Sequence, residues 1–308
     1  MKPKIIIICG PTASGKTQLG IECANRFNGE IISADSMQIY KKLDIGTAKP
    51  SKEELSLAVH HCIDIVEPSD NFSVGQYSKI AKEKIFDIIN QNKTPIIVGG
   101  TGLYIKSIIY PYTFADAPKD ETVRNKYKQM LEENGKEYIY SLLVDIDPES
   151  AKKIHINDTK KVIRALEIAE ISSALKSEQK KEDIDFEFEP ICVVLDFPRE
   201  ELYERINLRV DKMVDNGVLK EIKTLLDKKE INRDSQSMQA IGYKEFFAYL
   251  DGEMELDEAV ELLKKNTRNY AKRQLTFFRA FKFSEWFNPQ TQKDEIFKYI
   301  EQRLKNEN

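Results

Sequence analysis

The sequence of 308 residues has few cysteines and few histidines. Its four cysteines are far apart and form no C-x-x-C pair: Cys9, Cys23, Cys62 and Cys192. This spacing argues against a disulfide framework and a zinc knuckle, and it favours a reducing compartment. His60 and His61 stand beside Cys62, which is poor spacing for one metal ion. Packing or a hydrogen bond to the core is the better expectation for them.

Long hydrophobic runs and an excess of positive charge are also missing. The apolar run Ile5–Cys9 is too short for a signal peptide, and no stretch approaches the ~18 apolar residues of a membrane span. The 47 Lys and Arg residues stand against 51 Asp and Glu, so the net charge is −4. That balance argues against a protein that coats nucleic acid or a membrane by bulk charge. We expect a cytoplasmic protein with no membrane partner.

The first hundred residues alternate short β-branched runs with helical patterns. The pattern predicts buried strands at Lys4–Cys9, Glu30–Asp35 and Pro95–Val98. Helices are expected at Thr17–Phe27 and Ser73–Asn90. This alternation is typical of a parallel sheet with helices packed on it. Ligands of such folds bind at the carboxyl ends of the strands.

The pattern changes between Pro111 and Glu189, where helical segments dominate. Within this block Lys176–Glu189 is charged and apolar-poor, which predicts an exposed loop. A strand is expected again at Ile191–Asp196, followed by helices at Arg199–Asp227 and Leu256–Phe281. A strand that resumes after a helical block indicates that the block is inserted into an α/β core.

Residues 10–17 satisfy the phosphate-loop pattern G-x-x-x-x-G-K-[ST] between a predicted strand and a predicted helix. The glycines let successive backbone N–H groups converge on phosphate oxygens at a helix N-terminus. Lys16 adds a positive charge, and the Thr17 hydroxyl can hold Mg²⁺. The loop predicts a diphosphate or triphosphate ligand without specifying which one. The residues expected to bind it are Gly10, Pro11, Thr12, Ala13, Ser14, Gly15, Lys16 and Thr17.

Together these signals predict an α/β fold with a P-loop NTPase-like core, in which helices flank a parallel β-sheet. Residues 1–110 and 190–308 are expected to form this catalytic core with C-terminal helices. Residues 111–189 are expected to form an inserted all-helical domain.

Two further strand ends carry polar residues. Asp35 ends the second predicted strand, where it could be a general base, a metal ligand or a helix N-cap. The third strand ends in the glycine-rich turn Gly99–Tyr104, which allows close approach to a ligand. Thr101 could donate a hydrogen bond there, although a tight turn without a ligand fits the local sequence equally well.

Positive charge gathers in two segments of the sequence. Between Lys264 and Lys282 there are seven Lys and Arg residues and no acidic residue. Four aromatic residues are interleaved with them: Tyr270, Phe277, Phe278 and Phe281. Cations beside aromatic rings suit RNA phosphates and stacked bases, but a solvated basic helix with its aromatics in the core is equally compatible. The second segment, Lys152–Arg164, has five basic residues and one acidic residue, Asp158.

Taken in order, several blocks resemble one family, the bacterial-type tRNA dimethylallyltransferases or tRNA isopentenyltransferases. The similarity runs nearly end to end and is far more specific than the phosphate loop alone. The blocks are GPTASGKT (10–17), DSMQIY (35–40), DIGTAKP (44–50), HHCIDI (60–65), GGTGLY (99–104), NDTKKVIRALE (157–167), QAIGYKE (239–245) and TRNYAKRQLTFFR (267–279). Met37 and Lys161 depart from the pattern, because arginine is common at both positions.

The resemblance implies transfer of a dimethylallyl group from dimethylallyl diphosphate, with Mg²⁺, to N6 of the adenosine at tRNA position 37. It implies that Thr12 to Thr17 cradle the leaving diphosphate and that Asp35 accepts the proton from N6. Thr101 would hydrogen-bond near the breaking C–O bond, and Arg209 would contact the diphosphate. The helical insertion would clamp the anticodon stem-loop, and we expect a monomer.

The residues that the resemblance places against tRNA are Asp35, Ser36, Met37, Gln38, Thr101, Arg124, Lys160, Lys161, Val162, Ile163, Arg164, Gln239, Ala240, Ile241, Gly242, Tyr243, Lys244, Lys272, Arg273, Gln274, Leu275, Thr276, Phe277, Phe278 and Arg279.

Two other functions fit parts of the sequence. A P-loop kinase of a nucleotide or small metabolite would use Asp35 to activate an acceptor hydroxyl, but the sequence shows no arginine-rich lid segment. An RNA-binding module without chemistry would give Lys16 and Asp35 no reason to lie side by side.

Overall fold

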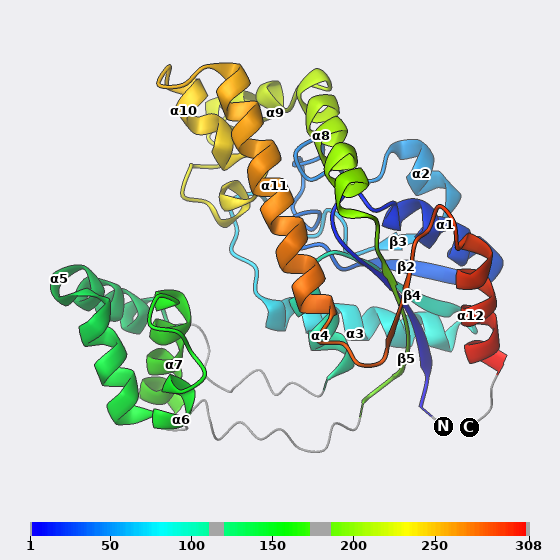
Figure 1. Ribbon diagram of the computed structural model, residues 1–308, viewed down its shortest axis with the longest axis horizontal. Coiled ribbons are helices and arrows are strands. Elements are labelled where there is room, and N and C mark those ends of the chain that lie inside the picture. Colours follow the sequence, from blue (N-terminus) through cyan, green and yellow to red (C-terminus); the bar gives the residue numbers. More distant parts are fainter. Residues whose placement is uncertain (1, 111–119, 173–185, 306–308) are drawn as a thin grey trace. The chain divides into compact units, whose positions relative to one another are not determined.

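The computed structural model describes residues 2–110, 120–172 and 186–305 (Figure 1). The chain folds into two compact units. The first, here called the core unit, comprises Met1–Ile109 and Phe186–Asn308. The second, the insert unit, comprises Tyr110–Asp185.

Within the described residues, six parallel strands form one sheet in the order β3-β2-β4-β1-β5-β6. The strands are β1 (Lys4–Cys9), β2 (Gly29–Ser33), β3 (His60–His61), β4 (Thr94–Gly99), β5 (Glu189–Leu195) and β6 (Ser284–Phe287). In the middle of the sheet, Cys9 of β1 lies opposite Gly99 of β4 and Val194 of β5. Since neighbouring strands are parallel, their carboxyl ends meet at one edge, and the predicted fold class is confirmed.

Helices cover both faces of this sheet because its Ile- and Val-rich strands are buried on both sides. Helices α1 (Lys16–Arg26) and α12 (Lys293–Lys305) pack against one face, burying residues such as Leu19 and Ile296. Helices α3 (Val74–Asn90) and α4 (Gly102–Ile109) pack together on the other side of β2 and β4. The short helix α2 (Lys52–Leu57) begins with a capping box formed by Ser51 and Glu54.

The remaining elements of the core unit follow β5 in the chain. They are α8 (Arg199–Asp215), α9 (Val218–Asp227), η2 (Gln236–Gln239), η3 (Lys244–Phe246), α10 (Phe247–Leu250) and α11 (Leu256–Phe278). Helices α8 and α11 pack together through Ile206 and Ala271, with Ala13 of the phosphate loop against them. Arg268 of α11 also donates a hydrogen bond to Asn207 of α8, 2.7 Å away. The two helices therefore stand beside the carboxyl edge of the sheet.

The prediction of one continuous helix after β5 is wrong. The span Arg199–Asp227 is two helices, because α8 ends at Asp215 and α9 begins at Val218. Between them Gly217 has φ +91°, a left-handed conformation that glycine adopts far more readily than other residues. The other predicted strands and helices are confirmed to within a few residues at each end.

Smaller predictions have mixed outcomes. His61 hydrogen-bonds through Nε2 to the buried carboxylate of Glu30 at 2.6 Å, which confirms the expected hydrogen bond to the core. All four cysteines are free and buried, so no disulfide forms. Most of the predicted loop at 176–189 lies outside the described residues. Its last residues contradict the prediction, because Phe188 is buried and Glu189 begins β5.

The insert unit has a hydrophobic core of its own. Its described elements are helices: α5 (Glu121–Ile146), which changes direction at Gly135, α6 (Pro148–Ala151) and α7 (Thr159–Ser172). Tyr127, Leu143 and Leu166 are among the residues that fill the core between them. None of the helices in the described segments of the whole chain combines the length and apolarity needed to cross a membrane.

Candidate active site

The ends of β2 and β4 are joined by hydrogen bonds that fix two predicted site residues. The backbone N–H of Thr101 donates to the Ala34 carbonyl at 3.0 Å. The Thr101 hydroxyl accepts the backbone N–H of Ser36 at 3.0 Å and lies 3.3 Å from the Ser36 hydroxyl. Asp35 accepts the backbone N–H of Met37 at 2.9 Å, so it closes a turn of the loop and does not cap a helix.

The phosphate loop follows β1 and leads into α1. Ala13 and Gly15 both have positive φ, which curls the loop over the start of the helix. The first backbone N–H groups of an α-helix have no partner within the helix, so they are available to an anion. Ser14 is 1% exposed, and its hydroxyl has no hydrogen-bond partner among the described residues. A buried hydroxyl without a partner at this place fits a loop built around a ligand.

Lys16, Asp35 and Arg209 come together at the loop. Lys16 and Thr17 line a cavity of about 40 Å³ with Asp35 and Gln38. The ammonium group of Lys16 donates to the Pro11 carbonyl at 2.6 Å. Burial and the nearby positive charge of Arg209 together lower the pKa of Lys16 to about 8, against the opposing effect of the negative charge of Asp35. The pKa of Arg209 is also lowered by burial and raised by Asp35.

Arg205 is a residue of this site that the sequence analysis missed. Its Nε donates to the carbonyl of Ala13 in the phosphate loop at 3.0 Å, and its guanidinium lies 4.6 Å from the ring centre of Phe197. Arg205 and Arg209 are four residues apart on α8, so they share one face of the helix. That spacing was the signal available in the sequence.

A larger cavity of about 810 Å³ opens beside the loop between α8 and residues 44–55. Its cationic lining residues are Lys49, Lys52, Arg205, Arg209 and Lys212, and its apolar ones include Ile45, Leu55, Leu208 and Met213. Lys49 is compensated by ion pairs with Asp44 at 2.6 Å and Asp64 at 2.5 Å. A mixed lining of this kind suits a ligand with an anionic end and a hydrocarbon end.

Helix α11 contributes Gln274 to the site, and the side chain of this residue is buried. Its Oε1 accepts the backbone N–H of Thr12 at 2.9 Å, and its Nε2 donates to the Gly100 carbonyl at 2.9 Å. The sequence placed Gln274 against tRNA, but its side chain turns toward the phosphate loop. The backbone N–H of Thr12 was expected to help cradle a diphosphate, and this group is instead engaged by Gln274.

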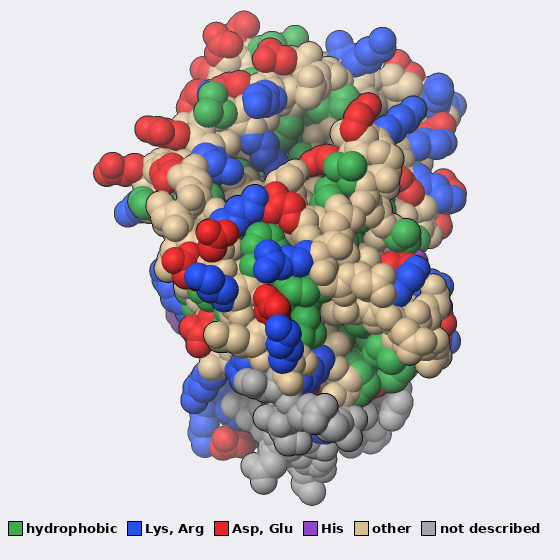
Figure 2. Space-filling model, turned by 90° about the vertical axis from the view of Figure 1, so that its right-hand side faces the viewer, with side chains coloured by type: hydrophobic (Ala, Val, Ile, Leu, Met, Phe, Trp, Pro, Cys, Tyr) green, Lys and Arg blue, Asp and Glu red, His purple; other side chains and the backbone are tan. Residues whose placement is uncertain are grey.

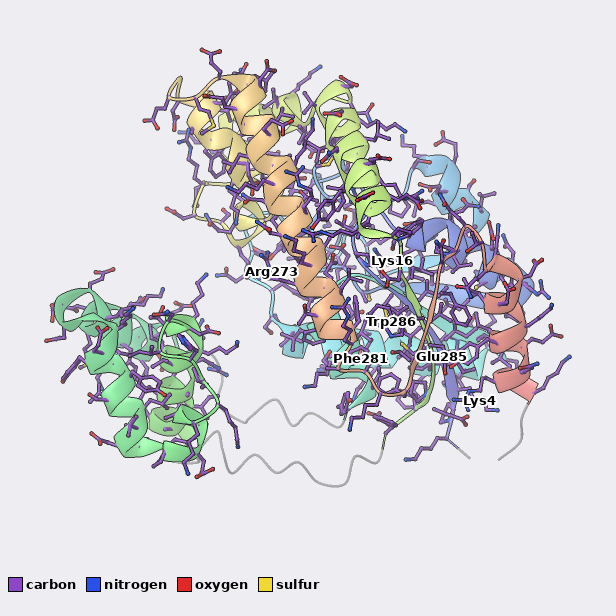
Figure 3. All side chains as sticks on the ribbon, viewed as in Figure 1. Lys4, Lys16, Arg273, Phe281, Glu285 and Trp286 are labelled. Atoms are coloured by element: carbon purple, nitrogen blue, oxygen red, sulfur yellow. The ribbon has the colours of Figure 1, made fainter. Side chains whose placement is uncertain are left out.

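The residues predicted to touch tRNA include an exposed set and a buried set, and the rest are half-buried. The exposed set is Lys160, Lys161, Gln239, Lys244, Lys272, Arg273, Thr276 and Arg279. The buried set is Val162, Ile163, Ala240, Gly242, Tyr243, Gln274 and Phe278. Side chains of the buried set pack in the interior, so the matching blocks contain packing residues as well as surface residues. Arg273 and Lys16 lie on opposite sides of α11 in the view of Figure 3.

In the insert unit, Arg124 is oriented by a buried carboxylate. Glu167 is fully buried and accepts hydrogen bonds from Nε of Arg124 at 3.2 Å and Nη2 at 2.7 Å. Arg164 forms an ion pair with the same carboxylate at 3.0 Å. The two arginines of the insert unit that the sequence assigned to RNA contact are thus held in fixed directions by one glutamate.

Positive charge is not spread over the whole core unit. Figure 2 shows the side over α12, where Lys and Arg side chains alternate with Asp and Glu. Ion pairs such as Lys293–Glu22 at 2.7 Å and Lys305–Glu301 at 2.7 Å account for part of this mixing. A surface of mixed sign gives RNA no local positive field.

A divalent cation fits the phosphate loop only together with a phosphate ligand. In the described segments, no three or more His, Cys, Asp or Glu side chains gather as metal ligands. The Thr17 hydroxyl and the Asp35 carboxylate line the same small cavity. Because Mg²⁺ commonly takes one or two protein oxygens, with phosphate oxygens and waters for the rest, these residues are compatible with it.

Comparisons with known proteins agree along the whole chain. Residues 38–281 match a protein family described as IPP transferase. A tRNA dimethylallyltransferase of Thermoanaerobacter sp. (strain X514) is 49% identical over 314 residues, covering 99% of each chain. Another from Bacillus subtilis (strain 168) is 46% identical and covers 98% of each chain.

Solved structures give the same match in three dimensions. A tRNA isopentenylpyrophosphate transferase from Bacillus halodurans aligns with a TM-score of 0.74 at 41% identity, over 98% of this chain and 97% of that one. A eukaryotic dimethylallyltransferase acting on tRNA aligns with a TM-score of 0.82 at 32% identity, over 98% of this chain and 77% of that one.

Proposed function

Because the chain belongs to the IPP transferase family, and is thus an enzyme that transfers a dimethylallyl group to tRNA, we propose that its acceptor is N6 of the adenosine at position 37. The proposed donor is dimethylallyl diphosphate. The observation that carries the proposal is the small cavity at the phosphate loop, which Lys16, Thr17 and Asp35 line together. A group for the leaving diphosphate and a group for the acceptor proton thus share one site.

The donor would bind with its diphosphate at the phosphate loop. Lys16 and the start of α1 offer positive charge and free N–H groups there, and Arg205 and Arg209 approach from α8. The apolar part of the larger cavity would receive the five-carbon chain, with Leu208 and Met213 among its lining residues. Stabilising the departing diphosphate makes the allylic carbon electrophilic, which the weakly nucleophilic adenine amino group requires.

Asp35 would act as the general base. Its carboxylate is held by the Met37 N–H, and it lies on the loop that also receives the Thr101 hydroxyl through Ser36. Removing the N6 proton as the C–N bond forms is worth about 10²–10⁴-fold in rate. The target base must leave its stack to reach this position, which costs a few kcal/mol.

Mg²⁺ would be held by the Thr17 hydroxyl with oxygens of the bound diphosphate. When bound, the ion supplies charge neutralisation for the leaving group. The protein itself contributes the ammonium of Lys16 and the loop N–H groups, which orient the diphosphate.

The tRNA would contact the exposed cations of α11, Lys272, Arg273 and Arg279, and the helices of the insert unit. Lys160 and Lys161 are exposed at the start of α7 and could bind backbone phosphates. We propose that one copy of the chain carries out the reaction in the cytoplasm, where its tRNA substrate is found.

The experiment that tests this function uses the purified protein, Mg²⁺, labelled dimethylallyl diphosphate and unmodified tRNA, followed by nucleoside analysis. We expect label in one modified adenosine, and none with a tRNA that carries guanosine at position 37. Preference for ATP with phosphoryl transfer to a small acceptor would overturn the proposal in favour of a kinase. Omission of Mg²⁺, with EDTA present, should abolish transfer.

A further inference from the structure

We propose that Gln274 is a positioning residue that ties the phosphate loop to the Thr101 turn, so that the helix carrying exposed cations for tRNA also sets the donor site. This inference rests on the proposed function. Gln274 acts through the backbone groups of Thr12 and Gly100 and not by contact with substrate.

The geometry makes Gln274 a cross-link between segments that are far apart in the chain. The phosphate loop follows β1 and the Thr101 turn follows β4, and these strands are neighbours in the sheet. Gln274 joins them above the sheet edge, with one amide end at 2.9 Å from Thr12 N and the other at 2.9 Å from Gly100 O. One side chain thus bridges the donor loop and the turn that holds Thr101, just beyond the point where the pairing of β1 and β4 ends.

The two partners also require an amide at this position. The Thr12 backbone offers a donor and the Gly100 backbone offers an acceptor, so the side chain between them must accept at one end and donate at the other. Gln274 does both, which fixes the direction of its amide. A carboxylate could serve only the Thr12 end, and an apolar side chain could serve neither end.

Gly100 shows how closely the side chain approaches the turn. A Cβ added at residue 100 would lie 2.3 Å from Nε2 of Gln274, closer than real atoms come. The absence of a side chain at this glycine is therefore part of the cross-link.

A direct contact with tRNA fits Gln274 less well than this positioning role. Its side chain is buried, and both ends of its amide are occupied by backbone groups. Its sequence neighbours Lys272 and Arg273 are exposed on α11. One stretch of the helix therefore presents cations outward and the amide inward.

The test compares Gln274→Met, which removes both hydrogen bonds at similar volume, with Gln274→Glu, which retains the acceptor for Thr12. We expect Gln274→Met to weaken binding of inorganic pyrophosphate at least fivefold and to lower kcat about tenfold, with the Kd for unmodified tRNA within twofold of wild type. Lys272→Ala is the matched control on the same helix, and it should raise the Kd for tRNA while pyrophosphate binding stays constant.

The pH dependence of Gln274→Glu separates positioning from a general loss of packing. When protonated, the new carboxyl group can donate to the Gly100 carbonyl, as the amide does. We expect its kcat/KM, divided by that of the wild type at the same pH, to be higher at pH 6 than at pH 8.5. The division removes the titration of Lys16, which all the proteins share, and the Gln274→Met ratio should stay flat.

Two results would overturn the inference. One is a raised Kd for tRNA in both Gln274 variants with pyrophosphate binding unchanged, which would make Gln274 a tRNA contact. The other is a Gln274→Glu ratio that does not vary with pH. Pyrophosphate binding needs no transfer reaction, so failure of the proposed function, seen as no product from the wild type, is distinguishable from failure of the cross-link.

Discussion

Asp35 is a single carboxylate on which the proposed proton transfer depends. Asp35→Asn keeps an oxygen for the Met37 N–H, so the loop should keep its shape while the base is lost. We expect the single-turnover rate to fall by about 10²–10⁴-fold, the range of general-base catalysis, with the Kd for tRNA unchanged. Asp70→Asn, at an exposed aspartate outside the cavity at the phosphate loop, is the control. An unaltered rate in Asp35→Asn would remove Asp35 from the chemistry.

Lys16 should make diphosphate binding depend on pH. Its pKa is lowered to about 8 by burial and by Arg209, so the free enzyme increasingly carries a neutral Lys16 as the pH rises above 8. A bound diphosphate favours the charged form, so binding should take up a proton at pH 8.5 and affinity should fall as the pH rises. Calorimetric titration with pyrophosphate and EDTA in two buffers of different protonation enthalpy measures this uptake.

Lys16→Arg is the matched variant for that titration because arginine stays charged throughout this range. Proton exchange by pyrophosphate itself is common to both proteins and cancels in the comparison. Equal proton uptake by the two proteins at pH 8.5 would show that Lys16 is already charged in the free enzyme.

Single residues show which parts of the site a sequence can reveal. Lys16 and Asp35 were predictable because each follows a strand, and parallel strand ends must meet at one edge. Arg205 and Gln274 were not identified as loop contacts, because each reaches the phosphate loop from a helix far along the chain. Burial of Val162 and Tyr243 could not be read from the matching blocks, since packing and binding residues recur together in them.

At the scale of elements, α11 should supply much of the electrostatic attraction for tRNA. Lys272→Ala combined with Arg273→Ala should weaken tRNA binding and reduce the slope of log Kd against log salt, because fewer counterions are released. The control is Lys298→Ala with Lys305→Ala on α12, where charges of both signs are mixed. Filter binding at several salt concentrations measures both slopes, and equal slopes for the wild type and the α11 variant would place α11 outside the interface.

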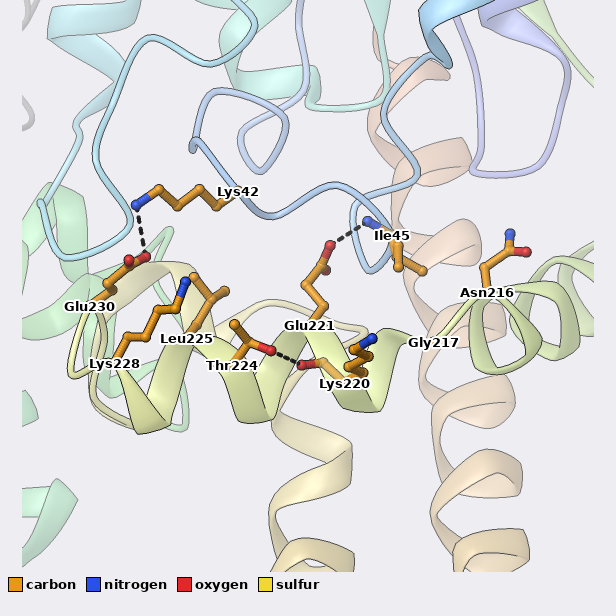
Figure 4. Close-up of a pocket in the computed structure, with 10 residues that line it drawn as sticks. All are labelled: Lys42, Ile45, Asn216, Gly217, Lys220, Glu221, Thr224, Leu225, Lys228 and Glu230. Atoms are coloured by element: carbon orange, nitrogen blue, oxygen red, sulfur yellow. Dashed lines mark hydrogen bonds and ion pairs between the residues drawn. The ribbon is translucent and has the colours of Figure 1, made fainter.

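Helix α9 should control the loop around Ile45, which lines the larger cavity and also a second cavity of about 340 Å³ that Figure 4 shows. Glu221 of α9 accepts the backbone N–H groups of Asp44 at 2.9 Å, Ile45 at 2.9 Å and Gly46 at 3.2 Å. It also accepts the Tyr243 hydroxyl at 2.8 Å, and burial, assisted by the charge of Glu221, raises the pKa of Tyr243 far above its ordinary value. One carboxylate thus satisfies four donors.

Glu221→Gln replaces one accepting oxygen by a donor that faces the same N–H groups. We expect the free energy of unfolding to fall by roughly 1–3 kcal/mol, because partly buried donors lose their acceptor, and the KM for the dimethylallyl donor to rise. Glu230→Gln, at a residue that lines the cavity of Figure 4 together with Glu221, breaks only the exposed pair with Lys42 and should cost about 0–1 kcal/mol. Urea unfolding measures both changes, and equal losses in the two variants would contradict the anchoring role.

The helices and strands were the most predictable features of this protein. Runs of Ile and Val identified the central strands, and helical spacing identified α3 and α11. The break at Gly217 was missed because a single glycine inside a helical pattern leaves the periodicity intact on both sides. The two-residue strand β3 is too short to produce an alternating pattern.

For the whole molecule, we expect both units to contribute to tRNA affinity independently. Lys160→Ala with Lys161→Ala in the insert unit should weaken binding about tenfold through lost phosphate contacts, as should the α11 pair. Because separated sites are additive within about 0.3–0.5 kcal/mol, the quadruple variant should bind about a hundredfold more weakly. If the quadruple variant binds tRNA with the same affinity as the double variant that binds less tightly, one of the two units makes no contact with tRNA.

The core unit is assembled from two stretches of chain, with β1 near the start paired to β5 across the insert unit, as Ile7 lies opposite Cys192. On a ribosome, the first hundred residues therefore emerge without the strand that completes the middle of their sheet. The insert unit, whose core residues are contiguous in sequence, can collapse before the sheet around it closes. Closure waits for β5 and α11, so the nascent chain completes its donor site only after Gln274 has been added.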